Sequence, residues 1–209
     1  MTPTIFFLFG FLLCTINSHV VARDFCIADL NSRDTPAGYP CKSPTNITVD
    51  DFVFSNFKLG KPNQFNSSVA TAYVGNFPAL NGLGFSIARG ELEEGVTIPL
   101  HLHPDTSEVV IAGSGNYTTG FISSDNVVYM KTLAEGDIFV IPKGLLHFGF
   151  NSGKGKVSAL FVLSHENPSI QIVDLALFGN KLDSSIIQKT TFLDDAQIKK
   201  LKALFKGSG

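Results

Sequence analysis

The sequence has little charge of either sign, few cysteines and no tryptophan. Charged residues make up 16% of the 209 residues and the formal net charge is −2, so the composition gives no case for nucleic-acid binding. By contrast, phenylalanine occurs 19 times and hydrophobic residues make up 44% of the chain. This length is enough to build one full hydrophobic core, so we expect a single domain.

Long apolar runs are absent beyond the N-terminus, so no membrane anchor is expected. The first run, from Ile5 to Ile16, has the length of a signal-peptide core and is too short to span a bilayer comfortably. Ser18 and Ala22 offer cleavage points, and the latter fits the small-x-small rule best. We predict that residues 1–22 are a signal peptide and that the mature protein is soluble and secreted. A retained anchor, the alternative, would need a longer run.

Secretion determines how the three cysteines are interpreted. Cys14 leaves with the signal peptide, so Cys26 and Cys41 remain as an even pair in an oxidising compartment. A bridge between them would stabilise the chain by about 3 kcal/mol on the chain-entropy estimate. Two widely spaced cysteines form neither a redox motif nor a zinc motif. We therefore predict a structural disulfide that staples an N-terminal arm, residues 23–53.

Three Asn-x-Ser/Thr sequons are candidate glycosylation sites, at Asn46, Asn66 and Asn116. Such triplets are common by chance, but secretion would expose each of them to the glycosylation machinery. The first two lie in polar, turn-like surroundings. Asn116 follows a glycine-rich turn, so it lies either at a hairpin tip or in a strand where a glycan has poor access.

Short apolar runs separated by Gly, Pro, Asn and Ser extend from about residue 51 to residue 174. This pattern predicts an all-β sandwich or barrel. The expected strands are 52–57, 84–89, 97–103, 108–111, 118–122, 126–132, 137–141, 145–150, 157–163 and 170–175.

The C-terminal tail has helical rather than strand-like spacing. Helices are expected over 182–189 and 194–206, with a cap where Thr191 is followed by Asp194. An apolar stripe on the second helix needs a partner, which is either the barrel or another subunit. The stripe consists of Ile198, Leu201, Leu204 and Phe205.

Two histidines two positions apart mark the candidate site. His101 and His103 lie in a β-type run, where residues i and i+2 point to the same face. Glu108 begins the next apolar run and can turn back onto the same site, while His147 lies in a later strand-like run. Neutral imidazoles together with one carboxylate suit a first-row divalent metal.

Each of these residues also has a simpler interpretation. A single histidine in an apolar strand is usually a hydrogen-bonded core residue, and a His-x-His pair is common by chance. However, three of the four histidines that remain after His19 fall in these two segments. Burying three imidazoles and a carboxylate without a shared partner would be costly. The spacing favours a metal site but does not choose among manganese, iron, zinc and copper.

Two longer motifs surround these residues. The first reads G-x5-H-x-H-x4-E-x6-G from Gly95 to Gly115, and the second reads G-x5-P-x-G-x2-H-x3-N from Gly136 to Asn151. Together they resemble the two signature boxes of the cupin superfamily in its plant germin-like form. The resemblance covers nearly the whole chain, which is most similar to the branch with auxin-binding-protein-like members.

The resemblance implies a cupin jelly-roll β-barrel with short C-terminal α-helices over residues 54–209. It implies one Mn2+ per chain, held by His101, His103, Glu108 and His147, and no catalytic residue beyond these ligands. It also implies a homo-oligomer, a hexamer built as a trimer of dimers, in the apoplast or cell wall. Asn151 is expected to hydrogen-bond a turn or the backbone.

The resemblance suggests two activities and one alternative. True germins hold oxalate with two asparagines; this chain has Ala88 and Ile98 at the matching positions, so oxalate oxidase activity is not expected. Superoxide dismutation asks only for a redox-active metal, an open site and proton access, and would suit a role in defence. The alternative is a non-enzymatic binding or receptor module whose metal anchors an auxin-like carboxylate.

Overall fold

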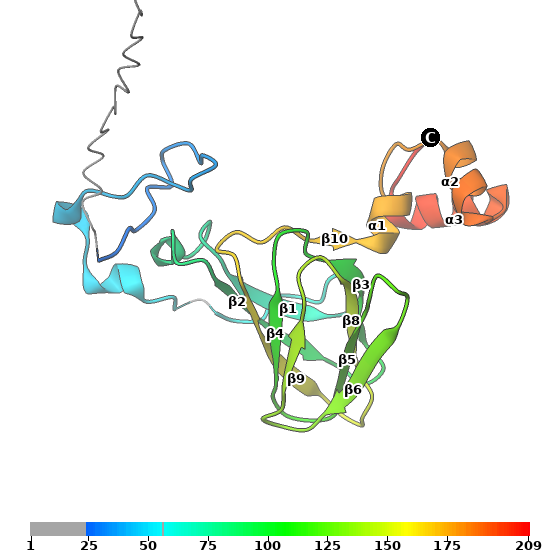
Figure 1. Ribbon diagram of the computed structural model, residues 1–209, viewed down its shortest axis with the longest axis horizontal. Coiled ribbons are helices and arrows are strands. Elements are labelled where there is room, and N and C mark those ends of the chain that lie inside the picture. Colours follow the sequence, from blue (N-terminus) through cyan, green and yellow to red (C-terminus); the bar gives the residue numbers. More distant parts are fainter. Residues whose placement is uncertain (1–23, 56) are drawn as a thin grey trace, which may run out of the picture.

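Two antiparallel sheets packed face to face form the centre of the computed structural model, which describes residues 24–55 and 57–209 (Figure 1). One sheet has the order β1-β2-β9-β4-β7 and the other β10-β3-β8-β5-β6. The predicted all-β barrel with short C-terminal helices is therefore confirmed. The predicted signal peptide, residues 1–22, lies outside the described residues. The strands are β1 (Ser68–Ala72), β2 (Ser86–Leu92), β3 (Thr97–Leu102), β4 (Glu108–Ala112), β5 (Tyr117–Ile122), β6 (Val128–Leu133), β7 (Ile138–Ile141), β8 (Leu146–Asn151), β9 (Val157–Leu163) and β10 (Gln171–Ile172).

Alternation of buried and half-buried residues places the core between the sheets. Strand β9 shows it most clearly, because every second residue from Val157 to Leu163 is buried. Strand β8 has the same period, but its inward residues are His147, Gly149 and Asn151. Successive side chains of a strand point to opposite faces, so β8 carries polar groups into an otherwise apolar interior.

Two predicted strands differ from the structure, and one strand of the structure was not predicted. The described residues of the range 52–57 form no strand, and Phe52 instead ends a 3-10 helix, η2 (Val49–Phe52), that begins with a capping box between Thr48 and Asp51. Strand β1 was missed, since its small and polar residues at a sheet edge lack the expected apolar pattern. Residues 170–175 are strand only at β10, after which helix α1 begins. Two further short 3-10 helices are η1 (Pro44–Asn46) and η3 (Pro78–Leu80).

The C-terminal helices α1 (Val173–Phe178), α2 (Ser184–Thr191) and α3 (Asp195–Phe205) build a small core of their own beside the barrel (Figure 1). Ile198 is fully buried against Phe178 and Ile187. The partner of the apolar stripe is thus the other two helices, although Leu204 stays 67% exposed. The cap of α3 is a capping box between Asp194 and Gln197 and does not involve Thr191. None of the helices in the described part of the chain is long and apolar enough to cross a membrane.

The N-terminal arm contains the Cys26–Cys41 disulfide. Its attachment to the barrel was not foreseen. The buried side chain of Asn81 donates to the backbone oxygen of Tyr39 at 2.9 Å and accepts from the Tyr39 amide at 3.2 Å. All three sequon asparagines are exposed, with Asn116 in the β4–β5 turn rather than within a strand.

Gly149 is required at its place on β8 because Tyr117 occupies the space that a side chain would need. A Cβ built on Gly149 would collide with the buried phenol ring of Tyr117. We expect Gly149→Ala to lower the free energy of unfolding by about 1–3 kcal/mol through overpacking, as measured by urea denaturation. Gly60→Ala is the matched control, since no atom lies within 4 Å of the added Cβ. Equal stability of the two variants would contradict the packing argument.

Candidate metal centre

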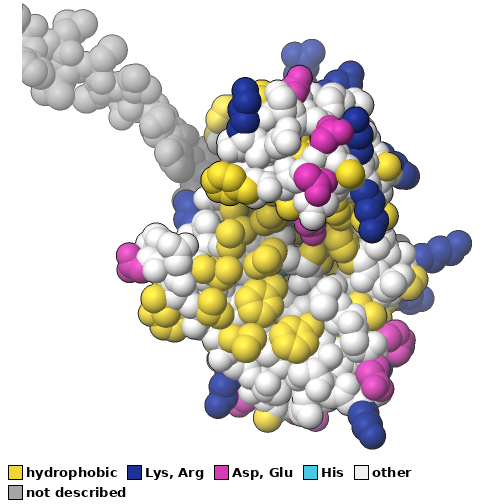
Figure 2. Space-filling view, turned by 90° about the vertical axis from the view of Figure 1, so that its right-hand side faces the viewer, with side chains coloured by type: hydrophobic (Ala, Val, Ile, Leu, Met, Phe, Trp, Pro, Cys, Tyr) yellow, Lys and Arg dark blue, Asp and Glu magenta, His cyan; other side chains and the backbone are white. Residues whose placement is uncertain are grey.

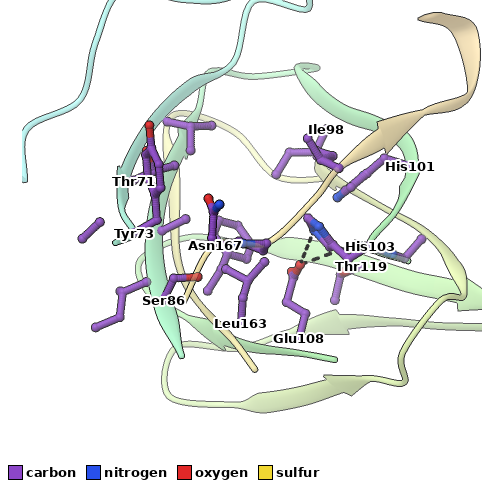
Figure 3. A pocket seen from close by; sticks show the side chains of 18 of the residues that line it. Thr71, Tyr73, Ser86, Ile98, His101, His103, Glu108, Thr119, Leu163 and Asn167 are labelled. Carbon is purple, nitrogen blue, oxygen red and sulfur yellow. Dashed lines mark ion pairs between the residues drawn. The ribbon is translucent and has the colours of Figure 1, made fainter. Parts of the chain in front are cut away.

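Four buried side chains converge inside the barrel, and Figure 3 labels three of them, His101, His103 and Glu108. His101 comes from the end of β3, His103 from just after it, Glu108 from the start of β4 and His147 from β8. Their possible ligand atoms all lie within 4.8 Å of one another. His101 and His147 are paired in register across β3 and β8. The structure therefore brings together all four residues that the sequence singled out.

Each imidazole is oriented by a backbone carbonyl. The Nδ1 atoms of His101, His103 and His147 lie 2.8, 2.6 and 2.8 Å from the carbonyl oxygens of Pro99, Ser169 and Leu145, respectively. A carbonyl oxygen can only accept, so each Nδ1 carries a proton and donates it. The lone pair of each neutral ring is then on Nε2, which is the arrangement that metal-binding histidines use.

Glu108 completes the cluster as an ionised carboxylate. Its Oε2 lies 3.3 Å from Nε2 of His103 and 3.5 Å from Nε2 of His147. Burial raises the pKa of Glu108, but the two imidazoles outweigh it and hold the pKa at about 2. A negative charge is thus present in the cluster at neutral pH.

The surroundings of the cluster shift the pKa values of His101 and His103 in opposite directions. Burial, together with the neighbouring His147, lowers the pKa of His101 to about 4, so this ring is neutral at pH 7. Burial also lowers the pKa of His103, but the contacts with Glu108 and with the Ser169 carbonyl dominate and raise it. A proton therefore competes with a metal ion for His103 more strongly than for His101.

The donor set fits a divalent metal ion. Nε2 of His147 is buried and has no hydrogen-bond partner within the described residues, although buried polar atoms are normally paired. A cation at the centre of the cluster would satisfy this nitrogen and neutralise Glu108. Three imidazole nitrogens and one carboxylate oxygen suit manganese, iron, zinc or copper.

A cavity of about 290 Å³ adjoins the cluster. Its mouth lies beside partly exposed residues of β1 and the loop before β10, among them Val69, Thr71 and Asn167. Ala88 and Ile98 both line it, which places the two positions singled out for oxalate binding at the site. Among the described residues, neither lysine nor arginine lines this cavity, so it presents an anion with no positive side chain.

Sequence reasoning missed the layer behind the ligands. Pro99 and Leu145 each lie two residues before the histidine that they orient, a repeated local pattern that the sequence contains. Ser169 lies 66 residues from His103, so no local signal could reveal it. Asn151 behaves as expected, because its side chain donates to the backbone oxygens of Leu92 and Gly155 at 3.1 and 2.6 Å.

Comparison with known proteins agrees with this architecture. The cupin family model matches residues 57–199. A germin-like protein from Morus alba is 44% identical over the full length of both chains. The auxin-binding protein ABP19b from Prunus persica is 47% identical over 98% of each chain.

Among solved structures, recombinant oxalate oxidase in complex with glycolate superimposes with a TM-score of 0.82 at 31% identity, covering 88% of this chain and 96% of that one. That enzyme therefore shares the overall fold of this chain. Full-length identity of this level, together with the family match, leaves one conclusion: the chain belongs to the cupin family, within its group of germin-like and auxin-binding proteins.

Proposed function

We propose that the protein is a secreted germin-like cupin that binds one Mn2+ per chain through His101, His103, Glu108 and His147. The observation that carries this proposal is the convergence of three carbonyl-oriented imidazoles and one ionised carboxylate around a nitrogen left without a partner. The chain then divides into a signal peptide (1–22), a disulfide-stapled arm (23–53) and the cupin barrel with its helices (54–209).

Secretion to the apoplast or cell wall is supported by three features. The N-terminal apolar run has signal-peptide length. The Cys26–Cys41 bridge requires an oxidising compartment. Asn46, Asn66 and Asn116 are all exposed, so each is accessible to glycosylation.

Superoxide dismutation is the activity that requires the fewest specific groups in this pocket, and it would serve a role in defence. A bound manganese ion supplies the one-electron redox couple. The three imidazoles and Glu108 would hold the ion where they line the cavity, and the cavity would admit a small reactant from the mouth beside β1.

Metal analysis paired with a superoxide-clearance assay tests this function. We expect manganese near one per chain in the natively secreted protein. His101→Ala should lose metal and clearance together, since one of four ligands is removed. His165→Ala is the matched control, because this histidine lies outside the cluster. Manganese without clearance would contradict the dismutase function, and absence of metal would contradict the site.

Oxalate oxidation is not expected of this site. Ala88 and Ile98 line the cavity without amide groups, and no cation lines it among the described residues, so an oxalate dianion would lose its polar partners on entry. The metal-loaded protein should therefore release no measurable hydrogen peroxide from oxalate in a peroxidase-coupled assay. Substantial turnover would contradict this reading of the pocket.

A metal-dependent binding module is the second candidate function. The apolar lining of the cavity favours it, because a carboxylate could bind the metal while its hydrocarbon part fills the pocket. The name of the peach relative, auxin-binding protein, points the same way. A metal-loaded protein that binds an indole carboxylate and does not clear superoxide would favour this candidate.

Homo-oligomerisation, with a hexamer as the expected state, is supported by an uncovered apolar face. The outer face of the β3-β8-β5-β6 sheet carries hydrophobic side chains that gather below the helices (Figure 2). Val128 and Met130 on β6 are 57% and 55% exposed. A groove on the same face is lined by apolar residues that include Leu100, Ile122 and Phe150. Apolar patches of this kind mark subunit interfaces.

Introducing charge on this face should break the assembly. We expect the Val128→Lys/Met130→Lys variant to shift toward smaller species in light scattering coupled to gel filtration, because two buried charges would oppose association. Glu135→Lys adds positive charge in the exposed β6–β7 turn and serves as the control. An unchanged mass for the double variant would place the interface elsewhere.

A further inference from the structure

The hydroxyl of Ser86 is a second buried polar group without a partner. Ser86 begins β2, is 2% exposed and lines the same cavity as the four-residue cluster. Its Oγ makes no hydrogen bond within the described residues; the other buried side-chain atom left unpaired there is Nε2 of His147. Since buried polar atoms are normally paired, both atoms indicate groups that a bound species would complete.

The sheet register places Ser86 and Glu108 in one row. Ser86 pairs with Leu163 on β9, and Leu163 pairs with Glu108 on β4. Paired residues point to the same face of a sheet, so all three face the interior. Figure 3 shows Ser86, Leu163 and Glu108 among the side chains that line the cavity. With strands about 4.8 Å apart, the Cα atoms of Ser86 and Glu108 are separated by roughly 10 Å.

The wall beside this row is apolar. Leu163 lies between Ser86 and Glu108, and the next inward row consists of Ala88, Phe161 and Val110. A polar neighbour, Thr119, is already engaged, because its hydroxyl donates to the backbone oxygen of Phe148. Thr71 and Asn167 are exposed, toward the mouth.

We infer that Ser86 is the specificity contact for a small monocarboxylate whose apolar body carries one hydrogen-bonding group at the end remote from the carboxylate. This inference rests on the proposed metal site. The carboxylate binds at the metal end, the body packs on Leu163, Ala88 and Phe161, and the remote group pairs with the Ser86 hydroxyl. A second full charge finds no partner there, so the site discriminates against dicarboxylates.

Two probes that differ by one hydroxyl test the inference. Phenylacetate and 4-hydroxyphenylacetate are titrated calorimetrically into the intact manganese-loaded protein. We expect the hydroxylated probe to bind up to about tenfold more tightly, as one additional buried hydrogen bond allows. Ser86→Ala should abolish this preference. The variant removes an unpaired hydroxyl and adds no atom, so its fold is not compromised.

Thr71→Val, also on the cavity wall, is the matched control and should keep the preference. The manganese content of Ser86→Ala should equal that of the unaltered protein, because Ser86 is not a member of the ligand cluster. Absence of metal in the unaltered protein would contradict the proposed function. With metal present, equal binding of both probes, binding of neither, or a preference that survives in Ser86→Ala would overturn the role of Ser86.

Discussion

Three hydrogen bonds from imidazole Nδ1 atoms to backbone carbonyls are the interactions on which the rest of the site depends. They fix the tautomer and the rotation of His101, His103 and His147, so all three Nε2 lone pairs face one point. Without them, the rings could turn within the barrel and the cluster would have no centre. Because the acceptors are backbone atoms of β3 and of the segments that lead into β8 and β10, this order is a property of the backbone and not of replaceable side chains.

The barrel gives these groups an environment that strengthens their effect. Burial alone would push Glu108 toward its neutral form, yet the imidazoles hold the carboxylate ionised. The same low-dielectric interior makes each unpaired polar atom expensive. Nε2 of His147 and Oγ of Ser86 therefore stand out as two unpaired polar atoms on the largely apolar lining of one cavity.

Much of the fold and site could be predicted from the sequence, and the failures have physical causes. The ligands could be found because strand period 2 puts His101 and His103 on one side, and because the glycines and prolines around them keep a recognisable spacing. Strand β1 could not, because edge strands of small residues carry little pattern. Neither the Asn81 link to Tyr39 nor the Ser169 contact was accessible, since tertiary folding alone brings such distant residues together. The Ser86 hydroxyl is unpaired because of the side chains that surround it in space, and the sequence alone does not show which side chains these are.

The position of Ser169 gives the helical segment a mechanical connection to the metal site. Its carbonyl holds His103, and three residues later Ile172 pairs with His101 through β10, directly before helix α1 begins. The helices contact the barrel chiefly through this short strand and β3. A displacement of the helices would therefore reach two of the three imidazoles along a few residues of backbone. The orientation of two of the three cluster imidazoles therefore depends on one short stretch of chain between the barrel and the helices.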